Sequence, residues 1–195
     1  MPLFHTQSAA VYGIDAHLID VEVDAYNGDP GIFITVGMPD TAVKESRERI
    51  KAAIVNSGLG YLSSSITINL APADVKKEGA GFDLPMAMGI LGAMGTVTNG
   101  KSLLLAGELA LDGMLRPVRG ALPMAILARD RGIESVLLPI ENASEASVVD
   151  GIRVFGLKHL SEVVAYFHNP ARFTPVTPLL PDLSKHAGAE PDFSD

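Results

Sequence analysis

The chain has 195 residues, of which 47% are hydrophobic, and it carries a formal net charge of −8. This size and composition allow one full hydrophobic core. The absence of cysteine excludes disulfides, thiolate metal sites and cysteine nucleophiles. The five histidines are scattered without metal-ligand spacing, so we predict no metal site. Because nucleic-acid binding depends on basic surface, the acidic balance restricts any such contact to a local patch.

The N-terminus and the apolar segments indicate no membrane association. Residues 1–10 lack the basic and apolar regions of a signal peptide. The longest apolar stretch, residues 84–95, is too short and too broken by glycine to cross a bilayer. We therefore expect a cytoplasmic protein with no membrane partner.

Three strands are predicted at the start of the chain. Residues 11–16 and 19–25 alternate apolar and polar side chains, and residues 31–36 are β-branched. Residues 27–31, Asn-Gly-Asp-Pro-Gly, supply strong turn chemistry between the second strand and the third. A meander, in which consecutive strands pair, is the simplest topology for this region.

A helix is predicted between Asp40, its N-cap, and Gly58, which ends it. One face is apolar and the other is charged, with Glu45 and Arg49 at the i,i+4 spacing of a favourable pair. The charged face also carries a basic stripe of Lys44, Arg47 and Lys51. This stripe is either a solvated surface or a binding surface.

Residues 65–70 predict a further strand, which leads into a loop containing Gly79 and Gly81. These glycines favour a tight turn that needs a positive φ. A helix then begins near Asp83, with Pro85 in its first turn, and Asp83 is placed to cap the helix N-terminus.

The second half of the chain alternates strands and helices. Strands are predicted at 103–111, with a turn at 112–113 and an extension through 115–118, and at 135–138 and 153–155; helices are predicted at 121–130, from 141, and at 159–168. The whole pattern predicts an α+β (mixed α/β) domain over residues 1–168, with an antiparallel start and later βαβ units. Residues 169–195 have the proline-rich composition of a linker.

Two segments resemble the peptidase domain of Lon-type serine proteases. Residues 77–83 are similar to the loop that carries the Lon nucleophile, and residues 107–122 are similar to the segment that ends in the general-base lysine. The resemblance implies a ribosomal protein S5 domain 2-like, Lon protease-like fold. The serine position is Gly81 and the lysine position is Leu122, so both members of the Ser-Lys dyad are absent. We therefore expect no catalytic residues in this chain.

The chain more closely resembles the N-terminal domain of the magnesium-chelatase-like AAA+ family, which includes the ComM and YifB proteins. The motifs that carry this resemblance are residues 12–16, 36–40, 43–49, 69–73, 77–79 and 82–85. In that family a Lon-like domain precedes a hexameric AAA+ ATPase that acts on DNA, in ComM as a branch-migration helicase used in natural transformation.

The resemblance implies that the parent protein's function depends on an AAA+ module, which this sequence does not contain. No Walker A motif is present, so we expect no ATP or magnesium binding here. ATP and magnesium belong to the AAA+ module of the parent protein. The expected partners are that missing ATPase domain, further copies of the parent in a homo-oligomer, and DNA.

A basic patch around the two degenerate dyad positions is the candidate site. In the Lon fold the serine and lysine loops face each other, so the flanking basic residues should converge and contact DNA. They are Lys76, Lys77, Arg116 and Arg119, and the stripe Lys44, Arg47 and Lys51 is a second candidate. The alternative is that these are solvated charges, or pair with Glu78, Asp83 or Asp112.

Two other functions are open at this point. One is a protein-docking module that makes no DNA contact. The other is a serine hydrolase with a relocated nucleophile, in which Ser63, Ser64 or Ser65 would work with Lys76 or Lys77.

Overall fold

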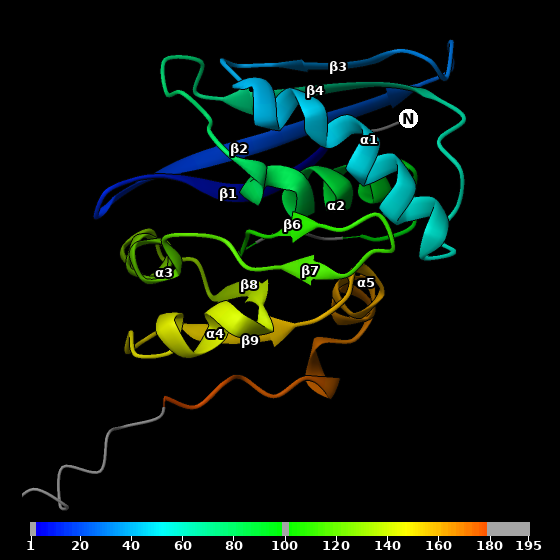
Figure 1. Ribbon diagram of the computed structural model, residues 1–195. Coiled ribbons are helices and arrows are strands. Elements are labelled where there is room, and N and C mark those ends of the chain that lie inside the picture. The colour runs from blue at the N-terminus through cyan, green and yellow to red at the C-terminus, as the bar shows by residue number, and fades with distance from the viewer. Residues whose placement is uncertain (1–2, 99–101, 179–195) are drawn as a thin grey trace, which may run out of the picture.

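A single twisted sheet with helices on both faces forms the centre of the molecule (Figure 1). The computed structural model describes residues 3–98 and 102–178. The sheet has seven strands in the order β3-β4-β2-β1-β5-β8-β9. The strands are β1 Phe4–Tyr12, β2 Asp15–Tyr26, β3 Phe33–Val36, β4 Ser65–Ala71, β5 Leu103–Leu105, β8 Ser135–Pro139 and β9 Arg153–Leu157.

The remaining elements are a small ribbon and the helices. β6 Glu108–Leu109 and β7 Leu115–Arg116 pair antiparallel. The α-helices are α1 Thr41–Asn56, α2 Asp83–Ala93, α3 Ala121–Asp130, α4 Ile140–Ala146 and α5 Leu160–His168.

Strand directions divide the sheet into two halves. β1 pairs antiparallel with β2, and β2 pairs antiparallel with β4. β5, β8 and β9 are parallel, with α3 and α4 as crossover helices between them. The predicted mixed α/β class, with an antiparallel start and later βαβ units, is therefore confirmed.

The predicted meander is wrong. β4, which follows α1 in the chain, inserts between β2 and β3, so β3 pairs only with β4 and in parallel. The predicted strand at residues 11–16 is also wrong, because Gly13, with φ of 62°, turns the chain between β1 and β2. β1 instead begins at Phe4, and its buried Ser8, Ala9 and Ala10 are residues with a weak strand signal.

The predicted strand at 103–111 divides into β5 and β6. Between them, the N–H of Gly107 donates to the carbonyl of Gly81 and the carbonyl of Gly107 accepts from Leu84. These bonds draw the segment away from the main sheet and toward the start of α2. The predicted turn at 112–113 is confirmed as the connection between β6 and β7.

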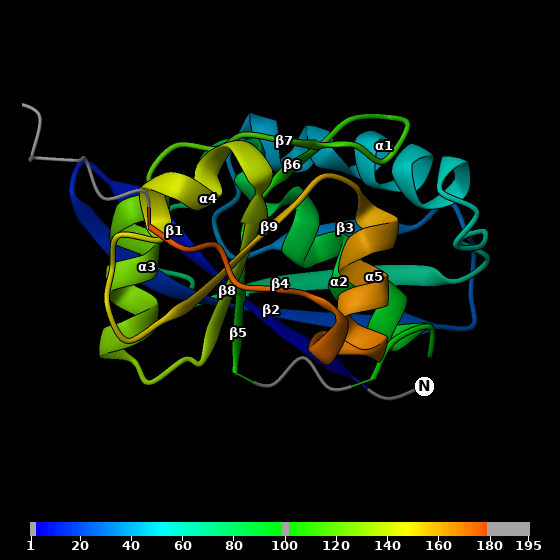
Figure 2. The same ribbon diagram turned by 90° about the horizontal axis from the view of Figure 1, so that it is seen from below.

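Both faces of the parallel half are covered, whereas the antiparallel half is covered mainly on one. α1, α2 and α5 share one hydrophobic core, and α3 and α4 pack with Leu104, Val136 and Val154 in a second core (Figure 2). Alternate strand residues such as Leu105 and Leu137 enter the first core. Burial on both faces explains why β5 and residues 136–138 of β8 are continuous apolar runs.

The predicted linker begins with residues that still contact the domain. The ring of Phe173 lies 5.5 Å from that of Tyr166, centroid to centroid, and the N–H of Val176 donates to the carbonyl of Val154 at 2.8 Å. Contacts therefore continue past the predicted boundary at residue 168. Residues 179–195 of the predicted linker lie outside the described residues.

No helix among the described residues is long and apolar enough to cross a membrane.

Candidate functional site

The loop between β4 and α2 is held in place by its backbone. The N–H of Lys77 donates to the carbonyl of Met38 at 3.1 Å, and the carbonyl of Lys77 accepts from the N–H of Asp40 at 2.9 Å. The hydroxyl of Tyr12 donates to the carbonyl of Lys76. The loop therefore continues the β3–β4 pairing through a parallel bridge between Pro39 and Lys77.

Asp40 connects this loop to α1. One carboxylate oxygen accepts from the N–H of Val43 at 2.8 Å, which confirms the predicted N-cap, and the other accepts from the N–H of Gly79 at 3.1 Å. Gly79 has a φ of 80°, as expected for a loop glycine. A single side chain thus fixes both the start of the helix and the glycine turn.

The position that carries the Lon nucleophile is closed by an aliphatic side chain. Gly81 faces the segment that follows β7, so that a Cβ built on it would lie 3.4 Å from Cγ1 of Val118. Asn142 of α4 fixes Val118 through two hydrogen bonds: it accepts from the N–H at 2.8 Å and donates to the carbonyl at 2.7 Å. The two loops therefore face each other as expected, but an apolar contact occupies the junction.

The position that carries the Lon general base offers no base. Leu122 is about one-third exposed, and its N–H donates to a carboxylate oxygen of Glu145 at 3.0 Å. A carboxylate at a helix N-terminus satisfies a free N–H and interacts favourably with the helix dipole. Glu145 thus stabilises the start of α3.

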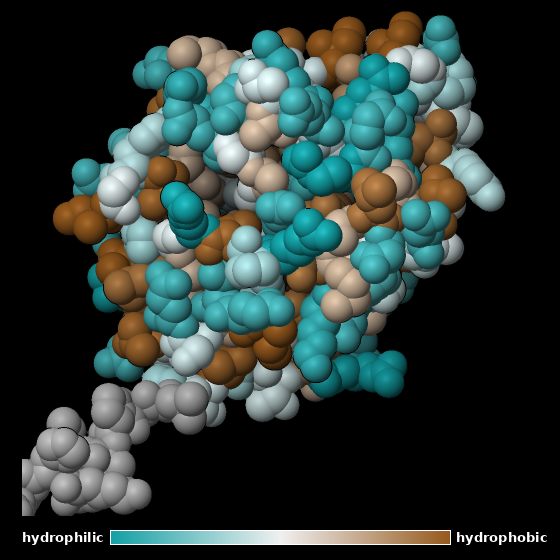
Figure 3. Space-filling model, in the orientation of Figure 1, coloured by the Kyte–Doolittle hydropathy of each residue, from teal (hydrophilic) through white to brown (hydrophobic). Residues whose placement is uncertain are grey.

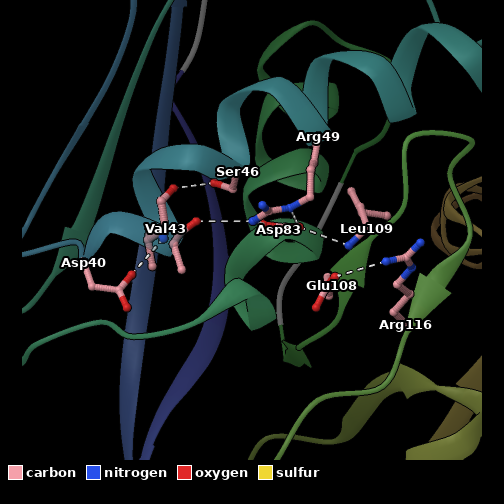
Figure 4. Close-up of polar contacts among 9 residues, drawn as sticks. Asp40, Val43, Ser46, Arg49, Asp83, Glu108, Leu109 and Arg116 are labelled. Atoms are coloured by element: carbon pink, nitrogen blue, oxygen red, sulfur yellow. Dashed lines mark hydrogen bonds and ion pairs between the residues drawn. The ribbon is translucent and has the colours of Figure 1, made fainter.

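An ion pair between α1 and α2 lies behind this surface (Figure 4). Asp83 is fully buried and accepts from Arg49 twice, at 2.7 and 3.1 Å, and from the N–H of Leu109 at 3.1 Å. Arg49 also donates to the carbonyl of Ala42 at 3.2 Å. The pair therefore joins α1, α2 and β6 at one point.

Burial and hydrogen bonding shift the pKa of Asp83 in opposite directions. Burial raises the pKa of Asp83 to about 6, while the hydrogen bonds from Arg49 and Leu109 act in the opposite direction. The hydrogen bond to Asp83 raises the pKa of Arg49. Two sequence interpretations are corrected here. Asp83 does not cap α2, and the side chain of Arg49, expected opposite Glu45, bonds to Asp83 instead.

Lys77 cannot belong to a surface patch, because it is fully buried. Its ammonium group donates to the carbonyl of Pro72, and burial lowers its pKa, with Asp74 acting in the opposite direction. The expectation that Lys77 contacts DNA is therefore corrected: its side chain stabilises the loop from inside.

Three of the four predicted patch residues remain on the surface. Lys76 forms an ion pair with Glu78, and Arg116 forms one with Glu108 at 3.7 Å. Arg119 is exposed, on the segment that also carries Val118. The hydrogen bond to Glu78 raises the pKa of Lys76. The positive charges of Lys76 and Arg116 are thus partly neutralised by their own ion pairs.

The second basic candidate, the α1 stripe, lies beside strand β3. Arg47 donates to the carbonyl of Gly31 at 2.9 Å and pairs with Glu48 at 3.2 Å. Arg47 and Lys51 lie 6.0 and 5.9 Å from the centroid of the Phe33 ring. Two members of the stripe therefore contact the edge of the sheet, and Lys44 is exposed next to them.

The relocated serine dyad is not assembled. Ser65, which is buried, begins β4 and donates its hydroxyl to the carbonyl of Asp29 at 2.9 Å. Lys76 and Lys77 follow the other end of this seven-residue strand, which at about 3.3 Å per residue separates the groups by roughly 20 Å. Ser63 and Ser64 precede β4 and lie on the same distant side.

No cluster of three or more potential metal-ligating side chains occurs within residues 3–98 and 102–178. Sequence reasoning missed Arg49, Asn142 and Glu145 as organisers of this region. Of these three residues, only the role of Arg49 could have been predicted from the sequence, because a charged residue close to the apolar face of a helix needs a buried partner.

The fold and the two facing loops define a Lon-like α/β domain, with Gly81 and Leu122 at the two positions where the resemblance predicts the dyad. Comparison with known proteins specifies the family. The model of subunit ChlI of Mg-chelatase matches residues 21–142. The chain is 38% identical to competence protein ComM of Haemophilus influenzae over 182 residues, covering 92% of this chain and 35% of ComM.

Further relatives agree with this assignment. The chain is 42% identical to YifB of Salmonella typhimurium over 168 residues, covering 85% of the chain and 32% of YifB. It is 27% identical to Lon protease 2 of Bacillus subtilis over 122 residues, covering 62% of the chain and 22% of that protease. The chain belongs to the magnesium-chelatase ChlI-like family, together with ComM and YifB, and spans about a third of the length of these two relatives.

Proposed function

We propose that this chain is the non-catalytic, Lon-like N-terminal domain of a ComM/YifB-type AAA+ ATPase. The parent protein would be a hexameric, ATP-dependent DNA branch-migration helicase that acts in recombination and natural transformation. ATP and magnesium would bind in the AAA+ module. The relationship to ComM over most of this chain supports the proposal.

The observation that carries the non-catalytic role is the junction of the two degenerate loops. Gly81 supplies no nucleophile and packs toward Val118, while the nearest polar partner of the Leu122 backbone is Glu145, an acceptor already in use. A covalent mechanism needs a nucleophile next to a base, and neither is present at these positions. The domain would therefore keep the Lon scaffold as a structural and binding element.

DNA contact is proposed for the surface formed by Lys76, Arg116 and Arg119. The side chains of Lys76 and Arg116 are 56% and 62% exposed, so both can reach a phosphate. Bound DNA would have to displace the acidic partners, Glu78 and Glu108, or lie beside their negative charge. A single domain would therefore bind DNA weakly. Several copies in a ring would act together, because each bound copy raises the effective concentration of the next.

The test is a salt series of DNA affinity in the full-length protein with Lys76, Arg116 and Arg119 changed to alanine. Each lost phosphate contact should lower the slope of log affinity against log salt by about 1. The matched control changes Arg153 to alanine, since this arginine is also exposed and paired, with Glu134 at 3.2 Å. An intact ring whose affinity and salt slope equal those of the control would refute the DNA contact.

A second candidate function is protein docking without DNA contact. It is favoured by a specific observation, the exposed apolar edge strand β3, at which Ile34 and Val36 are 48% and 45% exposed. Pull-down of a partner that persists at high salt and is lost on mutation of this strand would favour docking.

A further inference from the structure

Strand β3 carries a stripe of exposed apolar side chains at alternate positions. Ile34 and Val36 are 48% and 45% exposed, and Ile32 and Met38, which flank the strand, are 38% and 53% exposed. Alternate residues of a strand point to the same face, so Ile34 and Val36 form one row. Figure 3 shows hydrophobic surface along the upper edge of the molecule, where Figure 1 places β3. An edge strand with this pattern is a template for pairing with another strand.

Within residues 3–98 and 102–178, no strand pairs with the outer side of β3. The carbonyls of Ile32 and Met38 accept from the N–H groups of Ile66 and Lys77, so the even-numbered residues bond toward β4. Odd-numbered residues then point their N–H and C=O groups outward, because the direction alternates along a strand. Gly31, in the turn that precedes β3, has its carbonyl bonded to Arg47.

Phe33 and Thr35, the odd-numbered residues of β3, thus present their main-chain groups to the open edge. The side chains of Phe33 and Thr35 lie on the α1 side of the sheet, opposite the apolar stripe. That side is basic, because Arg47 and Lys51 lie over the Phe33 ring. Glu48 offsets one charge through its ion pair with Arg47, which leaves Lys51 and the exposed Lys44.

We propose that β3 is a docking edge for an extended segment of a partner protein, which adds as an eighth strand. The segment would alternate apolar and acidic residues. Its apolar side chains would pack beside Ile34 and Val36, while its acidic side chains would lie on the α1 side near Arg47 and Lys51. Main-chain hydrogen bonds to Phe33 and Thr35 would supply affinity, and the alternation of apolar and acidic side chains in the segment would supply specificity.

Pairing of two copies of the chain through β3 is disfavoured by charge. In an antiparallel pair of identical edges, a two-fold axis perpendicular to the sheet places both α1 helices on the same face. Arg47 and Lys51 of one copy would then approach the same residues of the other, and like charges repel. Nucleic acid is disfavoured because the apolar stripe offers no phosphate contact and Glu22 and Asp24 of β2 lie on the same face.

The experiment measures binding of a labelled probe peptide to the 195-residue chain by fluorescence anisotropy. The probe is an acetylated heptapeptide of alternating valine and glutamate, and the control peptide has lysine in place of glutamate. We expect the glutamate peptide to bind at least fivefold more tightly than the lysine peptide. We also expect at least a fivefold loss with Thr35→Pro, because proline removes an outward N–H and leaves the bonds to β4 intact. The matched control, Ile14→Thr, changes a side chain that is 90% exposed in the β1–β2 turn and should bind like wild type.

Amide hydrogen exchange of the wild type makes the test independent of any variant. The amides of Phe33 and Thr35 should exchange at least threefold more slowly when the glutamate peptide is added. No protection of these amides, or equal binding of the two peptides, overturns the proposal. So does a concentration-dependent dimer that Thr35→Pro abolishes, since the occupant would then be a second copy. Binding of duplex DNA that competes with the peptide would also overturn it.

Discussion

The ion pair between Arg49 and Asp83 should be the most sensitive polar contact of the domain. Asp83→Ala removes an acceptor of three hydrogen bonds from a fully buried site. Removing one partner of a buried pair costs about 3–5 kcal/mol. The side chain of Arg49 is 24% exposed and can reach water after the change, so we expect the lower end, about 3 kcal/mol.

Urea unfolding followed by circular dichroism measures this cost. With a slope of about 2 kcal/mol per molar, the midpoint should fall by about 1.5 M. The matched control is Glu48→Ala, which breaks an exposed pair and should cost about 1 kcal/mol or less. Replacing both partners, Arg49→Met with Asp83→Leu, should restore much of the loss because no charge is left unpaired. The reasoning is refuted when Asp83→Ala shifts the midpoint no more than Glu48→Ala does.

Two further predictions concern the same region. First, the folded-state pKa of Asp83 lies near 6, above its ordinary value of 3.8, so the native state holds a proton that the unfolded state has released between about pH 4 and 6. The free energy of unfolding of the wild type, relative to that of Asp83→Asn, should therefore be greatest below pH 4 and fall as pH rises through 6. Urea titrations at several pH values measure this difference. A difference that stays constant or rises with pH contradicts the prediction. Second, the chain should not cleave casein or a fluorogenic peptide, and Gly81→Ser alone should fold with a cost of about 1 kcal/mol or less, yet remain inactive because Leu122 cannot act as a base. Turnover by the purified wild type, or by Gly81→Ser, would show that the base is elsewhere.

Local sequence signals predicted the helices well. Asp40 as the N-cap of α1 and the extent of α3 from Ala121 to Asp130 follow from capping and periodicity, which act within a few residues. Pairing of β3 could not be predicted in this way. Its neighbour β4 begins at Ser65, after the whole of α1, and period-2 alternation says which face a strand buries but not which strand lies beside it.

The candidate site was predicted in outline but not in detail. The facing loops at Gly81 and Val118 follow from the Lon resemblance, and the packing of these two residues agrees with it. The burial of Lys77 could not be anticipated, because the adjacent Lys76 has the same side chain and is exposed. What distinguishes them is alternation along the extended backbone that pairs with Met38, which directs successive side chains to opposite sides.

The bond from Val176 to Val154 has a mechanical consequence for the domain. It attaches the end of the described chain to the outer edge of β9, whereas β3 forms the opposite edge. Six strand spacings of about 4.8 Å separate these two edges by roughly 29 Å. A force applied beyond residue 178 would therefore pull on one margin of the sheet while a ligand on β3 holds the other. The load would cross the sheet through the main-chain bonds between its strands, and its narrowest connection would be that of β1 to β5, which share one paired position, Gln7 and Leu104.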